Sequence, residues 1–330
     1  MFCPYCGLEH SEATPVSSEH IIPYAMGGSN QFTISVCEES NNRLGGQVDR
    51  PLIEFIPVRS ERFFLGLEGT DGTLPTLDLS GNTWVQGREL ELKSVIGPDG
   101  NGMRLTGREI VRTPKGDGER WDLRGSPEAI RKALAGKIQD QASKGKWVKT
   151  DKGEIITLDN LDQFLQAVTE EVQNPCVLRR IDFDYLWTWR FFAKLALATG
   201  QYLSGEEFSR SKRADELRRT MNARRLDEAA LTGAIIFPET HSLPPQFAQF
   251  QTKGFHTLCV SHGRPTFLLV SLFGWFDACV ALDRVHDGGG CRVVGNMQVI
   301  EIALPSRTLS KWSPADYLRV RAAREHPAQD

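Results

Sequence analysis

Three cysteines near the start of the chain have the spacing of a metal site. Cys3 and Cys6 flank two residues in the stretch CPYCG, and Cys37 lies further along the chain. Two thiolates at this spacing can bind one tetrahedral ion, and a third thiolate completes most of such a site. A fourth cysteine is expected at position 40, but Ser40 stands there, and a hydroxyl is a poor zinc ligand. The fourth ligand of a structural Zn²⁺ is therefore His10, a water molecule, or missing from a weak site.

A second set of polar residues lies between and just after these cysteines. Glu19 and His20 are adjacent in SSEHIIPYAMGG, and Asn41 and Asn42 follow Cys37. A carboxylate oxygen and an amide oxygen make a sparse set of hard ligands, which suits Mg²⁺ or Mn²⁺. A neutral histidine nearby can take a proton from an attacking water, because imidazole titrates near neutral pH. One metal ion and one base are enough to hydrolyse a phosphodiester bond.

Together, the stretches CPYCG, SSEHIIPYAMGGS and VCEESNNRLGGQVDRPL resemble the HNH endonucleases, the ββα-metal nucleases. The resemblance is limited to about residues 1–52. It implies a β-hairpin that carries Glu19 and His20, followed by a helix that carries Asn41. By position, Glu19 matches the first catalytic metal ligand, His20 the general base and Asn41 the last metal ligand. Asn42 is within reach as a substitute for Asn41, and Asp49 also fits the resemblance. The implied substrate is DNA, cut to leave 5′-phosphate ends.

Two positions depart from the family pattern. Ser40 replaces the expected fourth cysteine, which puts the zinc stoichiometry in question. The asparagine that orients the base usually precedes the second knuckle, and Gln31 occupies that place with Asn30 beside it. Either amide can hold the imidazole of His20 in one tautomer through its carbonyl oxygen.

The composition is that of an ordinary globular protein. The chain has 330 residues, of which 40% are hydrophobic and 25% are charged, with a net charge of −3. This slightly acidic balance disfavours a passive nucleic-acid coat but allows an enzyme with a local basic groove. No apolar run approaches the roughly 18 residues of a membrane span, so no membrane partner is expected. Seven cysteines and a start without signal-peptide features predict a cytoplasmic protein.

The pattern of elements predicts an α+β fold in three segments. These are a small zinc-knuckle ββα-metal module at 1–57, a mixed strand and helix region at 58–175, and an accessory region at 176–330 with central helices and a C-terminal antiparallel sheet. Helical patterns cover 126–141, 157–173, 182–205 and 204–225. Strand patterns cover 81–97, 102–113, 256–282 and 291–304. The segment 182–205 is apolar nearly all round, which predicts a buried central helix.

The helix predicted at 204–225 is rich in arginine. Arg213, Arg218 and Arg219 are its candidates for contact with nucleic-acid phosphates. Acidic residues such as Asp215 and Glu216 interleave with them, which fits a solvated amphipathic face equally well.

These observations favour a metal-dependent DNA endonuclease, with a role in defence against foreign DNA as a further hypothesis. An activator or a second copy of the chain is a candidate partner. Two alternatives remain open. One is a non-catalytic zinc-knuckle protein that binds nucleic acid, and the other is a ligand- or protein-sensing protein whose knuckle is a cap.

Overall fold

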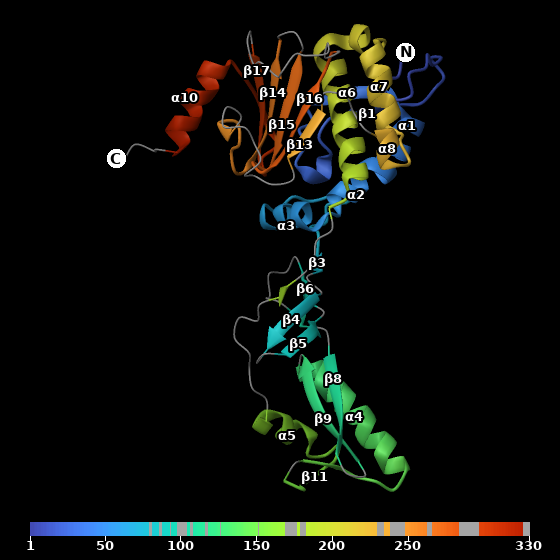
Figure 1. Cartoon of the computed structure of the whole chain (residues 1–330), viewed down its shortest axis with the longest axis vertical. Helices are drawn as coiled ribbons and strands as arrows, with labels where there is room; N and C mark the ends of the chain where they lie inside the picture. Colours follow the sequence, from blue (N-terminus) through green and yellow to red (C-terminus); the bar gives the residue numbers. More distant parts are fainter. Residues whose placement is uncertain are drawn as a thin grey trace. The chain divides into compact units, whose positions relative to one another are not determined.

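The computed structural model describes residues 1–78, 81–85, 88–92, 94–97, 104–105, 108–115, 118–125, 127–150, 152–168, 177–178, 183–229, 234–237, 248–262, 266–283 and 297–325. The chain forms two compact units, one made of residues 1–75 and 182–330 and the other of residues 76–181 (Figure 1). In these ranges every helix is too short or too polar to cross a membrane. Helices and strands are both present, which confirms the predicted mixed α and β fold.

The first unit begins with a ββα arrangement. Strands β1 (Val16–His20) and β2 (Thr33–Cys37) pair antiparallel, and helix α1 (Glu38–Leu44) starts directly after β2. Two glutamates in the first turn of α1 favour its N-terminus, where the helix dipole is positive. The predicted hairpin and helix are therefore present, with a short 3₁₀ turn η1 (Tyr24–Met26) in the connection.

Gly27 and Gly28 in this connection are required by the backbone. Gly27 has a φ of 94°, a conformation that L side chains rarely adopt. A Cβ at Gly28 would lie 1.8 Å from the carbonyl oxygen of Ile22. The glycine pair thus allows the chain to fold back tightly between the two strands.

Helix α1 does not end at Gly45 and Gly46. It continues as a short π-helix, η2 (Gly45–Asp49), into α2 (Arg50–Ile53), and α3 (Ile56–Phe64) follows. Single π-helical turns inside helices are rare and often occur at functional sites. This turn brings Asp49 into the interior, where its side chain is buried.

The later part of the first unit contains a six-stranded sheet. Its strands are β13 (Ala234–Phe237), β16 (Phe276–Ala281), β15 (Phe267–Leu272), β14 (Phe255–Ser261), β17 (Met297–Ala303) and β18 (Thr308–Trp312), in that spatial order. All neighbours are antiparallel, which confirms the predicted C-terminal sheet. Strands β15 and β16 are buried along their whole length, which explains their continuous apolar sequences.

Helix α6 (Tyr185–Ser209) is the predicted buried central helix. Asp184 caps it by accepting a hydrogen bond from the backbone N–H of Leu186 at 2.7 Å. Every residue from position 191 to 200 is buried. The single helix predicted at 204–225 is wrong, because α6 ends at Ser209 and α7 (Lys212–Met221) begins anew. Ser211 caps α7 through a hydrogen bond from the backbone N–H of Ala214, and α8 (Leu226–Ala229) follows.

One hydrophobic core joins the ββα region to α6 and the sheet. It includes Ile22 and Phe32 from the first segment, Leu195 from α6, and Leu258 and Ile300 from the sheet. The opposite sheet face is covered by α10 (Pro314–Glu325) through a second cluster (Figure 1). The predicted segments 1–57 and 176–330 therefore share a core.

In its described residues the second unit contains short antiparallel strands and two helices. The strands are β3 (Leu77–Asp78), β4 (Gly81–Val85), β5 (Arg88–Leu92), β6 (Ser94–Ile96), β7 (Arg104–Leu105), β8 (Arg108–Lys115), β9 (Gly118–Gly125), β10 (Val148–Lys149), β11 (Ile155–Ile156) and β12 (Val177–Leu178). The helices are α4 (Pro127–Ser143) and α5 (Leu161–Val168), joined by a salt bridge from Arg131 to Asp162. Helix α4 matches the prediction at 126–141, and α5 lies within the prediction at 157–173 but begins four residues later, at Leu161. Positions 126 and 169–173 lie outside the described residues.

His256 on β14 ties the sheet to the ββα region and gives the fold a dependence on pH. Its Nε2 donates to the carbonyl of Met26 at 2.7 Å, and its Nδ1 accepts from the N–H of Phe273 at 3.1 Å. Burial lowers the pKa of His256 from 6.5 to about 4, although the bond to Met26 opposes this. Between about pH 6.5 and pH 4, His256 therefore binds a proton in the unfolded chain but not in the folded chain.

We expect the free energy of unfolding to fall as the pH drops from about 6.5 to about 4, with His256 contributing up to about 3 kcal/mol. Urea unfolding at several pH values should be compared between the wild type and His256→Gln. The variant should be less stable at pH 7 and should lose less stability on acidification. Parallel curves for the two proteins would contradict the assignment.

Candidate functional site

The structure brings four potential zinc ligands together at the start of the chain. The ligand atoms of Cys3, Cys6, His10 and Cys37 all lie within 4.8 Å of one another. Sγ of Cys6 lies 3.1 Å from Nε2 of His10 and 3.9 Å from Sγ of Cys37. A tetrahedral zinc site with Zn–S bonds of about 2.3 Å has sulfur atoms about 3.8 Å apart, so this set fits a zinc ion. Of the alternatives for the fourth ligand, the geometry supports His10.

Ser40 has a different use from the cysteine it replaces. It is buried beside Cys37, and its hydroxyl and backbone N–H both hydrogen bond to the Cys37 sulfur. Burial raises the pKa of the Cys37 thiol, but these bonds and those from the neighbouring thiols outweigh it, so the pKa is lowered. Ser40 thus stabilises a thiolate ligand instead of acting as a ligand itself.

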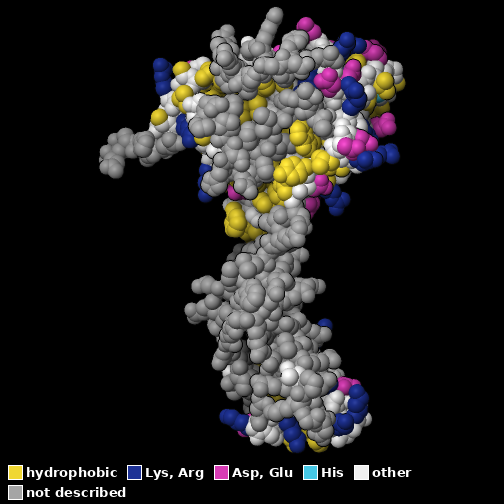
Figure 2. Space-filling model, in the orientation of Figure 1, with side chains coloured by type: hydrophobic (Ala, Val, Ile, Leu, Met, Phe, Trp, Pro, Cys, Tyr) yellow, Lys and Arg dark blue, Asp and Glu magenta, His cyan; other side chains and the backbone are white. Residues whose placement is uncertain are grey.

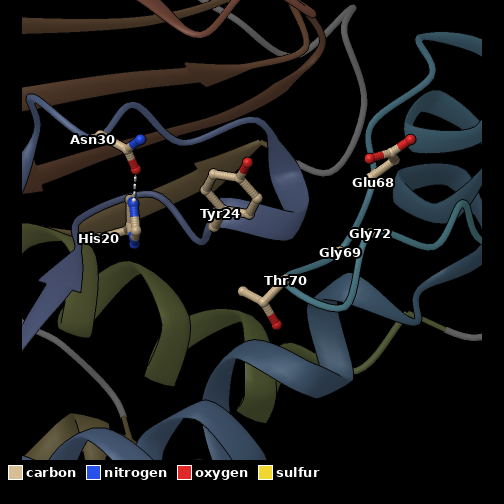
Figure 3. A pocket seen from close by; sticks show the side chains of 7 residues that line it. All are labelled: His20, Tyr24, Asn30, Glu68, Gly69, Thr70 and Gly72. Atoms are coloured by element: carbon tan, nitrogen blue, oxygen red, sulfur yellow. Dashed lines mark hydrogen bonds between the residues drawn. The ribbon is translucent and has the colours of Figure 1, made fainter.

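His20 lies at the end of β1 and lines an open pocket (Figure 3). Its Nε2 is 2.8 Å from Oδ1 of Asn30. An amide oxygen can only accept, so Nε2 carries the proton and Nδ1 presents a lone pair. The ring of Tyr24 lies beside the imidazole, with centroids 5.4 Å apart. The histidine is therefore held in the tautomer that a general base requires.

The pocket has a volume of about 320 Å³. Tyr24 and Asn30 line it together with His20, and the loop from Glu68 to Gly72 forms the facing wall (Figure 3). The other predicted orienting residue, Gln31, has an exposed side chain, and its N–H donates to Ser29. Of the two amides, Asn30 is the one that binds His20.

Glu19 points away from this pocket. Successive residues on a strand face opposite sides, so Glu19 turns inward where His20 turns outward. Glu19 is only 9% exposed, and Nζ of Lys194 on α6 donates to its Oε1. Asn41 shares the inward side, because its amide nitrogen donates to Ser17, two residues before Glu19 on β1, at 2.9 Å. Asn42 is exposed. The structure therefore gathers Glu19 and Asn41 on one face and His20 on the other.

Two residues that the sequence reasoning did not assign a role complete the inner cluster. Nζ of Lys194 also donates to Oδ2 of Asp49, so one ammonium joins two carboxylates. Burial raises the pKa of Asp49 to about 6 against the opposing effect of Lys194, and Glu19 raises it further. A lysine inside the apolar run FFAKLALATG was the available signal for this cluster.

Tyr5, from the knuckle, lies against the same cluster. The Lys194 ammonium is 5.7 Å from the centroid of its ring. Burial raises the pKa of Tyr5 well above its usual value, and the negative charges of Glu19 and Asp49 raise it further. Among the described residues, the Tyr5 hydroxyl and Oδ1 of Asp49 are buried without a hydrogen-bond partner. The cluster therefore holds more polar atoms than its own contacts satisfy.

The three arginines that were predicted to contact phosphates differ in burial. Arg213 is buried and donates to the carbonyl of Ala281, and Arg218 is buried and donates to the carbonyl of Pro4. Their burial argues against a role in phosphate contact, because both guanidinium groups bind inside the fold. Arg219 is exposed. In the part of the view where α7 lies, acidic and basic side chains intermix at the surface (Figure 2). The role of Arg219 remains a prediction.

These features define a ββα unit with a cysteine and histidine cluster that can hold a metal ion. Residues 3–55 match the family described as HNH endonuclease, which confirms the resemblance over this segment. A search of curated proteins and a search of solved structures found no match.

Proposed function

We propose that the chain is a metal-dependent endonuclease that hydrolyses phosphodiester bonds in DNA. The observation that carries this proposal is the hydrogen bond from His20 to Asn30 beside an open pocket. It leaves Nδ1 of a half-exposed imidazole free to accept a proton within a segment that matches the HNH endonucleases.

In this proposal His20 takes a proton from a water molecule as the water attacks the phosphorus atom. The bond from phosphorus to the 3′ oxygen breaks, and the departing oxygen takes a proton from solvent, which leaves a 5′-phosphate and a 3′-hydroxyl. Asn30 keeps the imidazole oriented and stabilises its protonated form, because the Nε2–H donates to a carbonyl oxygen in both states. Tyr24 restricts the ring from one side. The proton then leaves His20 to solvent through the open pocket.

Glu19 and Asn41 are the residues that would hold Mg²⁺ or Mn²⁺, with exposed Asn42 as a substitute ligand. Their carboxylate and amide oxygens suit such an ion. An ion held there would supply positive charge to a phosphate that lies across the end of β1, because Glu19 and His20 are the last two residues of that strand and leave it on opposite faces. The zinc at Cys3, Cys6, His10 and Cys37 would serve only the fold.

One observation favours a second candidate, a non-catalytic zinc-knuckle protein that binds nucleic acid. Lys194 neutralises the carboxylate that should hold the catalytic metal. Such a protein would bind DNA with an affinity that falls as salt rises, but would not cut it. A role in defence against foreign DNA, a cytoplasmic location and dependence on an activator fit either candidate and remain hypotheses.

The test is incubation of the purified, zinc-loaded protein with supercoiled plasmid in Mg²⁺ or Mn²⁺. We expect nicked or linear DNA, and no product when EDTA is present. A gel shift with the same samples separates the two candidates, since a shift with intact plasmid under all metal conditions would support binding alone. Products with 5′-phosphate ends, measured by ligation, would support the expected direction of hydrolysis.

A further inference from the structure

We propose that Glu19 and Asp49 form a buried cation site and that the ammonium of Lys194 competes there with the divalent metal ion. The inference rests on the proposed function only in taking Glu19 as a metal ligand. It adds Asp49 as a ligand and assigns Lys194 the role of a built-in inhibitor of metal binding.

The geometry of the cluster is that of a cation bound by carboxylates from separate elements. Glu19 comes from β1 and Asp49 from the π-helix η2, and both bind the Nζ atom of Lys194. All three side chains are almost completely buried, at 11%, 8% and 1% exposure for Glu19, Asp49 and Lys194. The position between the two carboxylates is therefore one where a positive charge is bound out of contact with bulk water.

The coordination around this position is incomplete. Oδ1 of Asp49 is buried and unpartnered among the described residues, and so is the hydroxyl of Tyr5 in the same cluster. An ammonium has three hydrogens to donate, whereas Mg²⁺ and Mn²⁺ bind six oxygen atoms and keep several water molecules. The spare oxygens match the needs of a divalent ion better than those of the lysine.

Charge also favours exchange. Two carboxylates and one ammonium leave the buried cluster with a net charge of −1, whereas a divalent ion in place of the ammonium would make it neutral. Both cations cannot remain on the same two carboxylates, because like charges at this separation repel strongly away from water. Metal binding therefore requires Lys194 to withdraw.

Lys194 couples the metal site to the accessory region. It lies in the buried middle of α6, and α6 packs against η2, β2 and β16. Withdrawal of the ammonium thus depends on how α6 sits against the ββα region. A partner that shifts α6 would raise the affinity for metal without touching His20.

The test is a Mn²⁺ titration followed by the electron paramagnetic resonance signal of free Mn²⁺, using zinc-loaded full-length protein. Lys194→Met removes the competing charge and keeps the length of the side chain. We expect it to tighten Mn²⁺ binding by at least about tenfold relative to the wild type. Lys212→Met removes an exposed lysine at the start of α7 and should leave the affinity unchanged. Adding Glu19→Gln to Lys194→Met should abolish the gain.

Because Lys194→Met leaves two buried carboxylates unpaired, Lys194→Met with Asp49→Asn provides a charge-balanced variant. Its Mn²⁺ affinity should lie between those of the wild type and Lys194→Met, since Glu19 is freed but the carboxylate of Asp49 is lost. Equal affinities for the wild type and the folded lysine variants would overturn the proposal. If these affinities are equal but the wild type still cleaves plasmid, the proposed cation site is refuted and the proposed nuclease activity is retained. Tighter Mn²⁺ binding without cleavage by any variant would instead refute the nuclease and retain the cation site.

Discussion

Replacement of His20 by alanine is expected to lower metal-dependent plasmid cleavage by about 10²- to 10⁴-fold, the usual contribution of a general base. The variant loses the only proton acceptor that the proposal places at the reacting water. Its fold should survive, because His20 is half exposed and its imidazole hydrogen bonds to the exposed side chain of Asn30. The measurement is the initial rate of plasmid nicking in Mg²⁺, with DNA affinity and the melting temperature determined in parallel.

Two further variants make this result specific. His262→Ala removes an exposed histidine from the end of β14 and should cut at the wild-type rate. Asn30→Ala should reduce the rate by about 10- to 100-fold, as expected when the partner that orients a functional histidine is lost. Equal rates for His20→Ala and the wild type would assign cleavage to another site or to a contaminant. If His20→Ala cuts more slowly and its melting temperature is also well below that of the wild type, the histidine has a structural role.

The ββα region was predictable from the sequence because its determinants are local. The glycine pair defines a tight return of the chain, and adjacent residues on a strand must face opposite sides. Glu19 and His20 are adjacent in the sequence, and the structure has them on opposite faces of β1. His10 was one of several possible ligands, and the choice needed the close approach of its ring to Cys6.

The inner cluster was not predictable because its partners are distant in sequence. Lys194 lies 175 positions from Glu19, and a lysine in an apolar helix does not itself indicate which carboxylate it meets. The arginine-rich segment illustrates a related limit. Its amphipathic pattern is compatible with either face being buried, and the structure buries Arg213 and Arg218 because backbone carbonyls of Ala281 and Pro4 accept their hydrogen bonds.

The predicted segmentation of the chain also depends on contacts that sequence patterns do not contain. Composition changes near positions 57 and 175 suggested separate regions. In the structure the chain leaves the first unit near residue 75 and rejoins it near 182, with one core spanning both parts. Since the ββα residues are buried against α6 and the sheet, the segment that matches the HNH endonucleases depends on the accessory region for its own stability.

Removal of the structural metal should therefore destabilise the whole first unit. A zinc ion at Cys3, Cys6, His10 and Cys37 would bind the folded chain and not the unfolded one, so its binding free energy would add directly to the stability. We expect Cys37→Ser to lose zinc, to cost at least about 3 kcal/mol, and to lower the melting temperature by roughly 6–12 °C. Metal analysis of the wild type should find about one zinc per chain. The measurements are elemental analysis and differential scanning calorimetry.

Matched variants separate loss of zinc from loss of a buried thiol. Cys259→Ala removes a buried cysteine on the far face of the sheet, so it should keep its zinc and lose as much stability on chelation as the wild type, whereas Cys37→Ser should change little. Ser40→Cys should not raise the melting temperature, because His10 already completes the ligand set and Ser40 donates to Cys37. A clear gain in stability from Ser40→Cys would show that His10 is a poor ligand. A wild-type protein that is folded without zinc would refute the structural site, because four ligand atoms within 4.8 Å would then be held by packing alone.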